Sequence, residues 1–528
     1  MFRWIRQWLR SEPPRVQEDL DLGQREALLR KTRLAENLEA NLETLQKAAG
    51  NSPDLKIRRF KIRKTSAALV FFEEMVSSST LSELLHHLQV ESMKADHYRP
   101  GLDWAKDRII DNAEISEAAL LDDILSRLAL GDTAVIVNGC AVALMVDTKG
   151  WETRSIIEPT AETSLRGSRE GFVESLRVNL SLVRRRVRTP NLWVEKYEIG
   201  HLTRTGVAIA FIKGLASEEL LAEVRSRLQR IDTDAILESG QIEEFIGDAP
   251  FSLYPTVLRT ERPDRVAAAI LEGRVAILTD GTPFALVVPA EFIMFLQAPD
   301  DYYEIVPIGV FIRALRGLAG LVAAFLPGVY VAALNFHPEL LPTSLLIRIT
   351  ATREGVPFPV AFEIFFIESV FELLREAGIR LPRAIGPAIS IVGALVLGEA
   401  AIRAGVVSPG AVIVVALTAI ASFAVPVFSV GIVGRLVRFA IIILGAVFGL
   451  FGVQFGLLLL SIHVVSLRSF GVPYFSPLGP LVVADLKDAA IRVFTWQMVR
   501  RPKLVGAREP VRQRPGQRPR VGREGDRS

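Results

Sequence analysis

The sequence predicts an α+β soluble region of two related subdomains, followed by an all-α polytopic membrane domain. Charged residues crowd the first 304 of the 528 residues and the C-terminal tail, whereas residues 317–467 contain long charge-free runs. In the soluble part, apolar strand patterns alternate with helix signals. One order of these patterns occurs twice, about 140 residues apart, which is typical of an internal repeat.

The composition excludes several kinds of site. Cys140 is the only cysteine, so no disulfide can form within the chain, and a cytoplasmic setting suits the soluble part. The six histidines show no metal-ligand spacing, and no phosphate-binding loop, nucleophile elbow or dinucleotide fingerprint is visible. We therefore expect no enzyme activity, no cofactor, no bound metal and no nucleic-acid partner.

Residues 1–50 are predicted to form an N-terminal helical and flexible segment. The first ten residues mix arginines with large apolar side chains but have no signal-peptide core, which fits either a short interfacial helix or a frayed terminus. Farther on, one helical stripe is predicted by leucines spaced four, four and three residues apart, at Leu34, Leu38, Leu42 and Leu45.

The two subdomains are predicted at residues 51–157 and 190–304. Each opens with the order strand, turn, strand, helix, over residues 55–85 in the first and 192–228 in the second. Later in each, Asn138-Gly139 and Asp280-Gly281 separate two apolar runs, which predicts hairpins with two-residue type I′ turns. We expect short strands with helices on one face.

The predicted connector, residues 158–189, ends in the basic run Arg184-Arg185-Arg186-Val187-Arg188. Such a cluster could bind phosphate or anionic lipid. The favoured interpretation is that these arginines complement a helix C-terminus and pair with local acids.

The predicted membrane domain, residues 305–490, contains about five helices. Residues 317–336 are long enough to cross a bilayer core of ~30 Å, and the preceding Arg313 and Arg316 place the soluble domain in the cytoplasm. Residues 384–434 are predicted to form a membrane hairpin broken at 406–410. The last run, 439–467, has His463 as its only titratable group, interpreted as a packing residue. It also holds four glycines at spacings of four, three and four, interpreted as a packing face: Gly445, Gly449, Gly452 and Gly456.

Three carboxylates lie in an otherwise apolar helix predicted over residues 360–374. Ionisable groups at membrane depth are costly and usually face a protein interior or a water-filled path, so this helix is the expected ion path. Its candidate residues are Val360, Glu363, Ile364, Glu368 and Glu372. The other interpretation makes them structural, with Glu363 paired to Arg353 or Arg348 and Glu372 at the cytoplasmic boundary beside Arg375.

The side of the C-terminus depends on the run 439–467. Five spans would put the C-terminus outside, yet residues 500–528 are strongly basic, which favours the inside. Either the run is a bent pair of helices or the tail violates the rule. Residues 491–528, rich in arginine, proline and glycine, are predicted to be a basic disordered tail that can contact anionic lipid.

Several long motifs, in order, resemble the GerA family of spore germination proteins. The soluble motifs are RGSREGF at 166–172, DTDAILESG at 232–240, TERPDRV at 260–266 and LEGRVAI at 271–277. The membrane half adds REGVPFP at 353–359 and LRSFGVPY at 467–474. The resemblance covers about residues 50–490.

This resemblance implies the A subunit of a nutrient germinant receptor in the inner spore membrane, with its N-terminal domain cytoplasmic. It implies a transporter-like B subunit and a lipoprotein C subunit as partners, contact with membrane lipid, and a homo-oligomer that forms a ligand-gated cation channel. Two alternatives stay open: an accessory spore membrane channel of the same family that lacks nutrient specificity, and a membrane-anchored scaffold.

Overall fold

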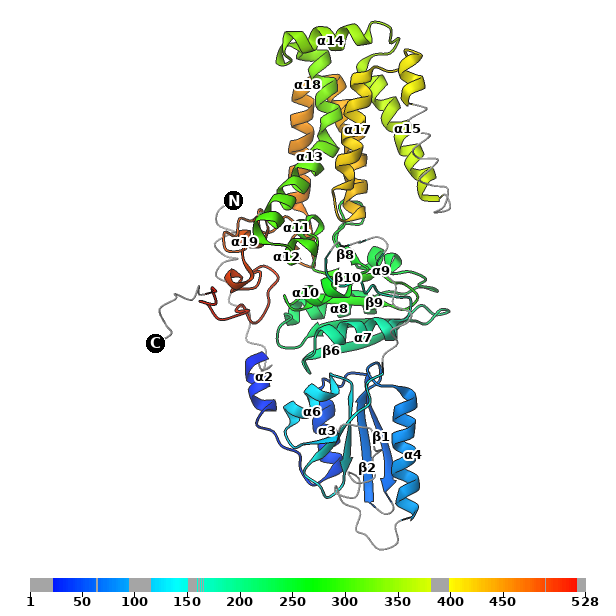
Figure 1. Ribbon diagram of the computed structural model, residues 1–528, viewed down its shortest axis with the longest axis vertical. Helices are drawn as coiled ribbons and strands as arrows, with labels where there is room; N and C mark the ends of the chain where they lie inside the picture. The colour runs from blue at the N-terminus through cyan, green and yellow to red at the C-terminus, as the bar shows by residue number, and fades with distance from the viewer. Residues whose placement is uncertain are drawn as a thin grey trace, which may run out of the picture.

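The computed structural model describes residues 22–62, 65–94, 115–150, 159, 162, 164, 166–380, 398–489 and 491–519. Residues 1–10, for which the sequence fits either an interfacial helix or a frayed terminus, lie outside them. The molecule has three tiers along its long axis, with a helical bundle at one end, a second α+β subdomain in the middle and a first at the other end (Figure 1). This arrangement confirms the predicted fold class.

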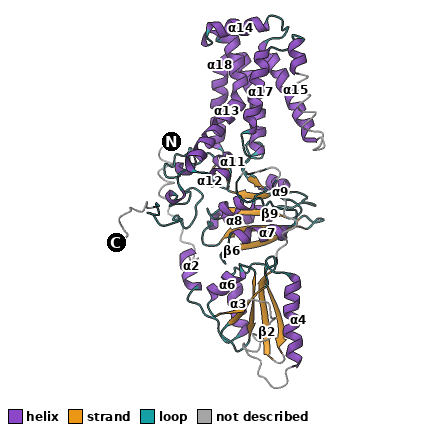
Figure 2. Cartoon of the chain, viewed as in Figure 1, coloured by secondary structure: helices purple, strands orange, loops and turns teal. Residues whose placement is uncertain are grey.

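Each soluble subdomain is built around a β-sheet (Figure 2). Both sheets are five-stranded and antiparallel, and they have the same topology. The first has strand order β1-β2-β4-β5-β3, and the second β6-β7-β9-β10-β8. The first sheet comprises β1 (Leu55–Ile62), β2 (Thr65–Phe72), β3 (Ile115–Ala118), β4 (Asp132–Val137) and β5 (Ala143–Asp147). The second comprises β6 (Leu192–Ile199), β7 (Thr205–Ile212), β8 (Leu258–Thr260), β9 (Val275–Thr279) and β10 (Ala285–Val288). The predicted internal repeat is thus a repeated topology.

Helices cover both faces of each sheet, so the expectation of helices on one face was wrong. The central strands are buried along nearly their whole length, since six consecutive residues of β2 and of β7 are buried. Continuous apolar runs of this kind are typical of strands with both faces covered. The helices of the first subdomain are α2 (Leu22–Leu29), α3 (Leu38–Ala48), α4 (Ser78–Lys94) and α6 (Leu121–Leu128). Those of the second are α7 (Leu176–Arg186), α8 (Glu218–Gln229), α9 (Ser239–Ile246) and α10 (Pro263–Ile270).

Each repeat begins one helix earlier than the sequence predicted. Helix α3, placed in the N-terminal segment, packs into the core of the first sheet, and α7, placed in the connector, packs into that of the second. Asn41 of α3 brackets the backbone of Ala35, donating to its O at 2.6 Å and accepting from its N at 2.7 Å. Asn179 of α7 brackets Val173 in the same way, at 2.6 and 2.8 Å.

The Asn-Gly and Asp-Gly pairs do not form two-residue turns. Residues Ile136 and Ala143 are register partners, so six residues lie between them, and the equivalent loop in the second sheet is as long. The Asn138 side chain instead accepts a hydrogen bond from the N–H of Leu38, at the start of α3, at 3.0 Å. Asp280 does the same for Leu176 of α7 at 2.9 Å. These acceptors satisfy N–H groups that a helix start leaves free.

Ion pairs join the two subdomains, and one of these pairs is fully buried. Arg184 of α7 contacts Asp54 of the first subdomain at 2.5 Å, with side-chain exposures of 1% and 0%. Next to it, Lys196 lies 3.3 Å from Glu74. Arg185 and Arg186 both pair with Glu170. Arg185 and Arg186 therefore pair with a local acid, as the favoured interpretation held, whereas Arg184 pairs with an acid of the other subdomain.

Within the described residues, the helical bundle has two helices long and apolar enough to cross a membrane, α13 (Val306–Phe336) and α18 (Phe428–Ser466). Between them lie α14 (Thr343–Arg353), α15 (Val360–Arg380) and α17 (Pro409–Phe423). The first arm of the hairpin predicted at 384–434 falls largely outside the described residues. Its second arm is α17, which ends before Pro426, so α18 begins earlier than predicted.

Helix α18 is a hairpin of two antiparallel arms. The backbone of Gly449 is non-helical, with φ 63° and ψ −148°. A Cβ built on Gly456 would lie 2.5 Å from Ile441, although fifteen residues of straight helix would separate them by ~22 Å. Residues from both ends of α18, Val430 and Val464, join the core of the second subdomain. The structure thus has the bent pair, with three of the four glycines in the packing face and Gly449 as its turn.

The chain after α18 returns to the second subdomain. Ser469 donates to the carbonyl of Thr256 at 2.6 Å and accepts from the N–H of Ala290 at 2.9 Å, and Tyr474 is fully buried. Farther on, the buried Arg501 donates to the carbonyl of Leu271 at 2.9 Å. Residues 468–489 therefore pack on the soluble domain rather than within the bundle. Within the segment predicted to be a disordered tail, Arg501 thus makes specific backbone contacts that composition does not reveal.

Candidate functional site: carboxylates and arginines between the membrane helices

Helix α15 lies beside α17 and α18 and brings the predicted carboxylates against arginines from three other places in the chain. It runs parallel to α17, since Glu363 near its start contacts Ser408 at the start of α17, and Arg375 farther along donates to Ser422 near the end of α17 at 3.3 Å. The helix forms because its interior lacks proline and glycine over 360–376.

Glu363 lies at the start of α17 and is 1% exposed. Its carboxylate accepts a hydrogen bond from the N–H of Ser408, the N-cap of α17, and lies 3.3 Å from Nε of Arg353. Free N–H groups and the helix dipole both favour a negative charge at this position. Of the two interpretations of Glu363, the geometry matches the one in which it pairs with Arg353.

Glu368 forms the most buried ion pair of the bundle. Its Oε2 lies 2.5 Å from Nη1 of Arg438, and each residue is 1% exposed. Nε of Arg438 also donates to the carbonyl of Ala323 in α13, at 2.7 Å. One arginine thus ties α15, α18 and α13 together.

Glu372 is one helical turn farther along α15 and is less buried. Arg435 of α18 donates a short hydrogen bond to it, and Nη1 of Arg375 lies 3.6 Å away. Arg435 and Arg438 follow directly after the hairpin predicted at residues 384–434. The structure puts them inside α18, where Arg438 pairs with Glu368 and Arg435 pairs with Glu372. The two arginines are three residues apart and the two carboxylates four, so each set lies about one helical turn apart on one face of its helix. This complementary spacing was the signal that sequence analysis missed.

The other two candidate residues pack in an apolar cluster. Val360 and Ile364 are buried against Val331, Val415 and Ile442. The opposite face of α15 is open, with Phe362, Phe366 and Leu373 exposed. In a single chain the carboxylates therefore face inward to arginines, while the outer face is available to lipid or another subunit.

Some buried polar atoms near these carboxylates and arginines have no hydrogen-bond partner. Among the described residues, Oε1 of Glu368, Nη2 of Arg438 and the hydroxyl of Tyr330 are buried without a hydrogen-bond partner. Such atoms are rare in folded proteins and mark places where a polar group or ion can be accommodated. Within the described residues there is no group of three or more His, Cys, Asp or Glu side chains that could hold a metal ion.

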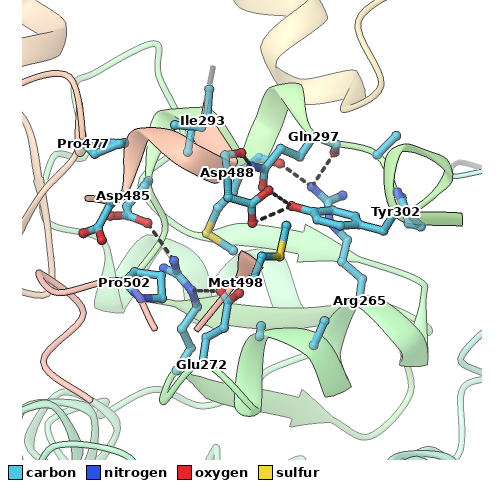
Figure 3. Close-up of a pocket in the computed structure, with 18 of the residues that line it drawn as sticks. Arg265, Glu272, Ile293, Gln297, Tyr302, Pro477, Asp485, Asp488, Met498 and Pro502 are labelled. Atoms are coloured by element: carbon cyan, nitrogen blue, oxygen red, sulfur yellow. Dashed lines mark hydrogen bonds and ion pairs between the residues drawn. The ribbon is translucent and has the colours of Figure 1, made fainter. Parts of the chain in front are cut away.

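A separate pocket of about 410 Å³ lies where the second subdomain meets the chain after α18 (Figure 3). The hydroxyl of Tyr302 donates to the Asp488 carboxylate, 3.0 Å from each oxygen. Burial raises the pKa of Asp488, and it also raises the pKa of Glu272 and of Asp485 on the same walls. Three carboxyl groups thus lie close together on the walls of this pocket, where burial disfavours their charged form.

The base of α13 is anchored beside this pocket. Arg313 and Arg316, which the sequence predicted at the cytoplasmic end of the first span, both contact the buried Asp301, at 3.3 and 2.9 Å. Arg313 also lies 3.5 Å from Asp488. One cluster of ion pairs therefore holds together the first membrane helix, α13, and the segment that follows α18.

Comparison with known proteins identifies the family. Residues 43–504 match the family model of the Bacillus/Clostridium GerA spore germination protein. Spore germination protein KA of Bacillus subtilis (strain 168) is 45% identical over 491 residues, covering 92% of this chain and 90% of that protein. Spore germination protein GerLA of Bacillus cereus is 36% identical over 476 residues, covering 90% and 96%.

One solved structure is also similar, the N-terminal domain of the A subunit of the Bacillus megaterium spore germinant receptor GerK3. It is 36% identical, covers 49% of this chain and 98% of that one, and has a TM-score of 0.40. The family match spans most of the chain and both halves of the fold. This membrane protein therefore belongs to the GerA family of spore germination proteins, which are not enzymes.

Proposed function

We propose that this chain is the A subunit of a spore germinant receptor, acting with a transporter-like B subunit and a lipoprotein C subunit in the inner spore membrane. In this proposal several copies assemble into a cation channel, and their α+β subdomains face the cytoplasm. The basic residues Arg313 and Arg316 at the base of α13 support that orientation. The α18 hairpin supports it too, since it returns the basic C-terminal segment to the soluble domain.

The observation that carries the proposal is the burial of Glu363 and Glu368 in a membrane helix. Holding a carboxylate at this depth is costly, and such residues in membrane proteins mark ion or proton pathways. The open face of α15, with Phe362, Phe366 and Leu373 exposed, supports assembly because another copy can cover it.

The arginines suggest how the path is kept closed. Arg353, Arg438 and Arg435 neutralise the three carboxylates in the single chain. A cation can interact with these carboxylates only when α15 shifts away from the arginines. Germinant binding drives that shift to the extent that the germinant has a higher affinity for the open arrangement.

The test is potassium release from spores that carry Glu363→Gln or Glu368→Gln, after nutrient addition and with receptor abundance checked by blot. Glu376→Gln is the matched control, since Glu376 lies on the same helix but is 59% exposed in its pair with Arg380. Slowed or leaky release at normal abundance, with an unaffected control, is the expected result.

Release that is unchanged in both variants places the path elsewhere in the bundle. Purified receptor that conducts no cations in liposomes, with or without the B and C subunits, supports the scaffold instead. Normal nutrient responses in spores lacking this chain, but with slower completion of germination, support the accessory channel.

A further inference from the structure

The loop between α9 and β8 exposes apolar side chains at the base of the membrane helices. Phe251 is 100% exposed and Leu253 is 55% exposed. From Ala249 to Pro255 the loop has no charged residue. A fully exposed phenylalanine at the tip of an uncharged loop has no role in the core of its own subdomain, so its partner lies outside the subdomain.

The base of the loop is held firmly. Asp248 lies 2.7 Å from Nη2 of Arg227 and accepts a hydrogen bond from the N–H of Phe470 at 2.6 Å. Within the loop, the N–H of Tyr254 donates to the hydroxyl of Ser252 at 3.1 Å. These contacts therefore hold the tip of the loop in one orientation, away from the sheet.

A contact with the last turn of α18 fixes the position of the tip. The hydroxyl of Ser252, between the two exposed residues, lies 2.9 Å from Nε2 of His463, and the ring of Tyr254 lies 6.1 Å from the His463 ring. His463 is three residues before the helix end at Ser466, which is ~5 Å along the axis. Phe251 is thus held close to the last turn of this membrane helix.

The neighbouring helix surface is apolar as well. Ile462 and Val465, one residue before and two after His463, are 58% and 49% exposed. At the same end of the bundle, the start of α13 exposes Ile308, Ile312 and Leu315, and its N-cap Ile305 is exposed as well. The loop therefore extends an exposed apolar surface at this end of the bundle.

We propose that residues 249–255 form a membrane-inserting loop, whose Phe251 and Leu253 enter the headgroup and upper acyl region of the lipid bilayer beside α18. Aromatic and apolar side chains are enriched at this depth in membrane proteins, and uncharged tips enter it without desolvating an ion. The loop thereby sets the height of the second subdomain above the membrane. This insertion does not require the chain to form a channel.

The single native cysteine makes a direct test possible. In full-length protein carrying Cys140→Ser, Phe251→Cys is labelled with bimane and reconstituted into nanodiscs of phosphatidylcholine and phosphatidylglycerol. The label is then exposed to lipids with a doxyl group near the headgroup, and separately to aqueous iodide. The matched control is Leu28→Cys, 54% exposed on α2 in the subdomain far from the bundle (Figure 1).

The expected result is quenching of the Phe251 label several-fold more by doxyl lipid than by iodide, with the opposite order at Leu28. Leu253→Cys repeats the measurement should Phe251→Cys not fold. A label quenched by iodide as strongly as Leu28 overturns the proposal. Protection from both quenchers that disappears at one copy per nanodisc also overturns it, because the loop would then contact a second copy of the chain.

Discussion

Glu368 of α15 and Arg438 of α18 meet at 2.5 Å, and each residue is 1% exposed. The free energy of this pair depends on both partners, because removing one leaves a buried charge that nothing compensates. Arg438→Met is therefore expected to destabilise the bundle by about 3–5 kcal/mol. Thermal unfolding in detergent and receptor abundance in the membrane measure the effect.

Two further variants test whether the uncompensated charge of Glu368 causes that loss of stability. Adding Glu368→Gln to Arg438→Met removes the uncompensated charge and is expected to restore much of the lost stability. Arg403→Met is the control, since Arg403 and Glu399 form a pair with side-chain exposures of 78% and 55%, and such pairs contribute at most about 1 kcal/mol. Equal losses in Arg438→Met and Arg403→Met would contradict the argument.

Gly449 is expected to tolerate no side chain. Its φ of 63° is unfavourable for other residues, and a Cβ would lie 3.1 Å from both Phe336 and His337. Gly449→Ala should lower the stability of the folded bundle by about 1–2 kcal/mol or more, seen as a lower unfolding temperature in detergent. Gly431→Ala in the same helix, where a Cβ meets nothing within 4 Å, should be neutral or slightly stabilising. A neutral Gly449→Ala would argue against the hairpin.

Glu74 is expected to make the joint between the subdomains sensitive to pH. Burial, and after it the nearby Asp54, raises the pKa of Glu74 from 4.5 to about 7. The folded state thus binds a proton on the Glu74 carboxyl more tightly than the unfolded state does. Protonation of Glu74 therefore stabilises the fold fully below pH 4.5, and this stabilisation is lost as pH rises through 7.

Glu74→Gln should therefore raise the unfolding temperature of the soluble region at pH 8 and leave it nearly unchanged at pH 4.5. The gain is at most about 3 kcal/mol, reduced by the lost contact with Lys196. Scanning fluorimetry of the full chain between pH 4.5 and 8 measures it. Glu73→Gln, which removes a 42% exposed carboxylate, should leave the pH dependence unchanged. A parallel shift at all pH values would rule out titration of Glu74.

Arg501 is expected to hold the C-terminal segment on the second subdomain. It donates to the carbonyls of Leu271, Glu509 and Val511 at 2.8–2.9 Å. Hydrogen bonds from a charged donor contribute about 1.5–3 kcal/mol each. Arg501→Ala should therefore speed thermolysin cleavage within residues 500–512 at least tenfold. The exposed Arg500 provides the control, and equal cleavage of Arg500→Ala and Arg501→Ala would contradict this role.

Local patterns predicted the elements but not the contacts that complete them. The strand, turn, strand, helix order was correct in both subdomains, because apolar runs and Ser217 at a helix start are local signals. The turns at Asn138 and Asp280 were wrong, since those side chains bond to helices about 100 residues away in the chain. No short-range rule includes such a contact.

In the candidate site, too, local features could be predicted from the sequence and long-range contacts could not. Hydropathy and the three carboxylates of α15 were evident from the sequence, because charge in an apolar helix is a local property. Their partners were not evident, since Arg353, Arg438 and Arg435 come from segments that meet α15 only after the bundle has packed.

The sequence by itself determined the division into a soluble repeat and a membrane domain, the family, and the carboxylates of α15. These follow from composition, periodicity and motifs, which are properties of the chain read in order. Three features became evident only in the folded chain: Glu368 pairs with Arg438, α18 turns back at Gly449, and Ser252 lies beside His463. Each depends on distances between residues far apart in the chain, and packing sets those distances.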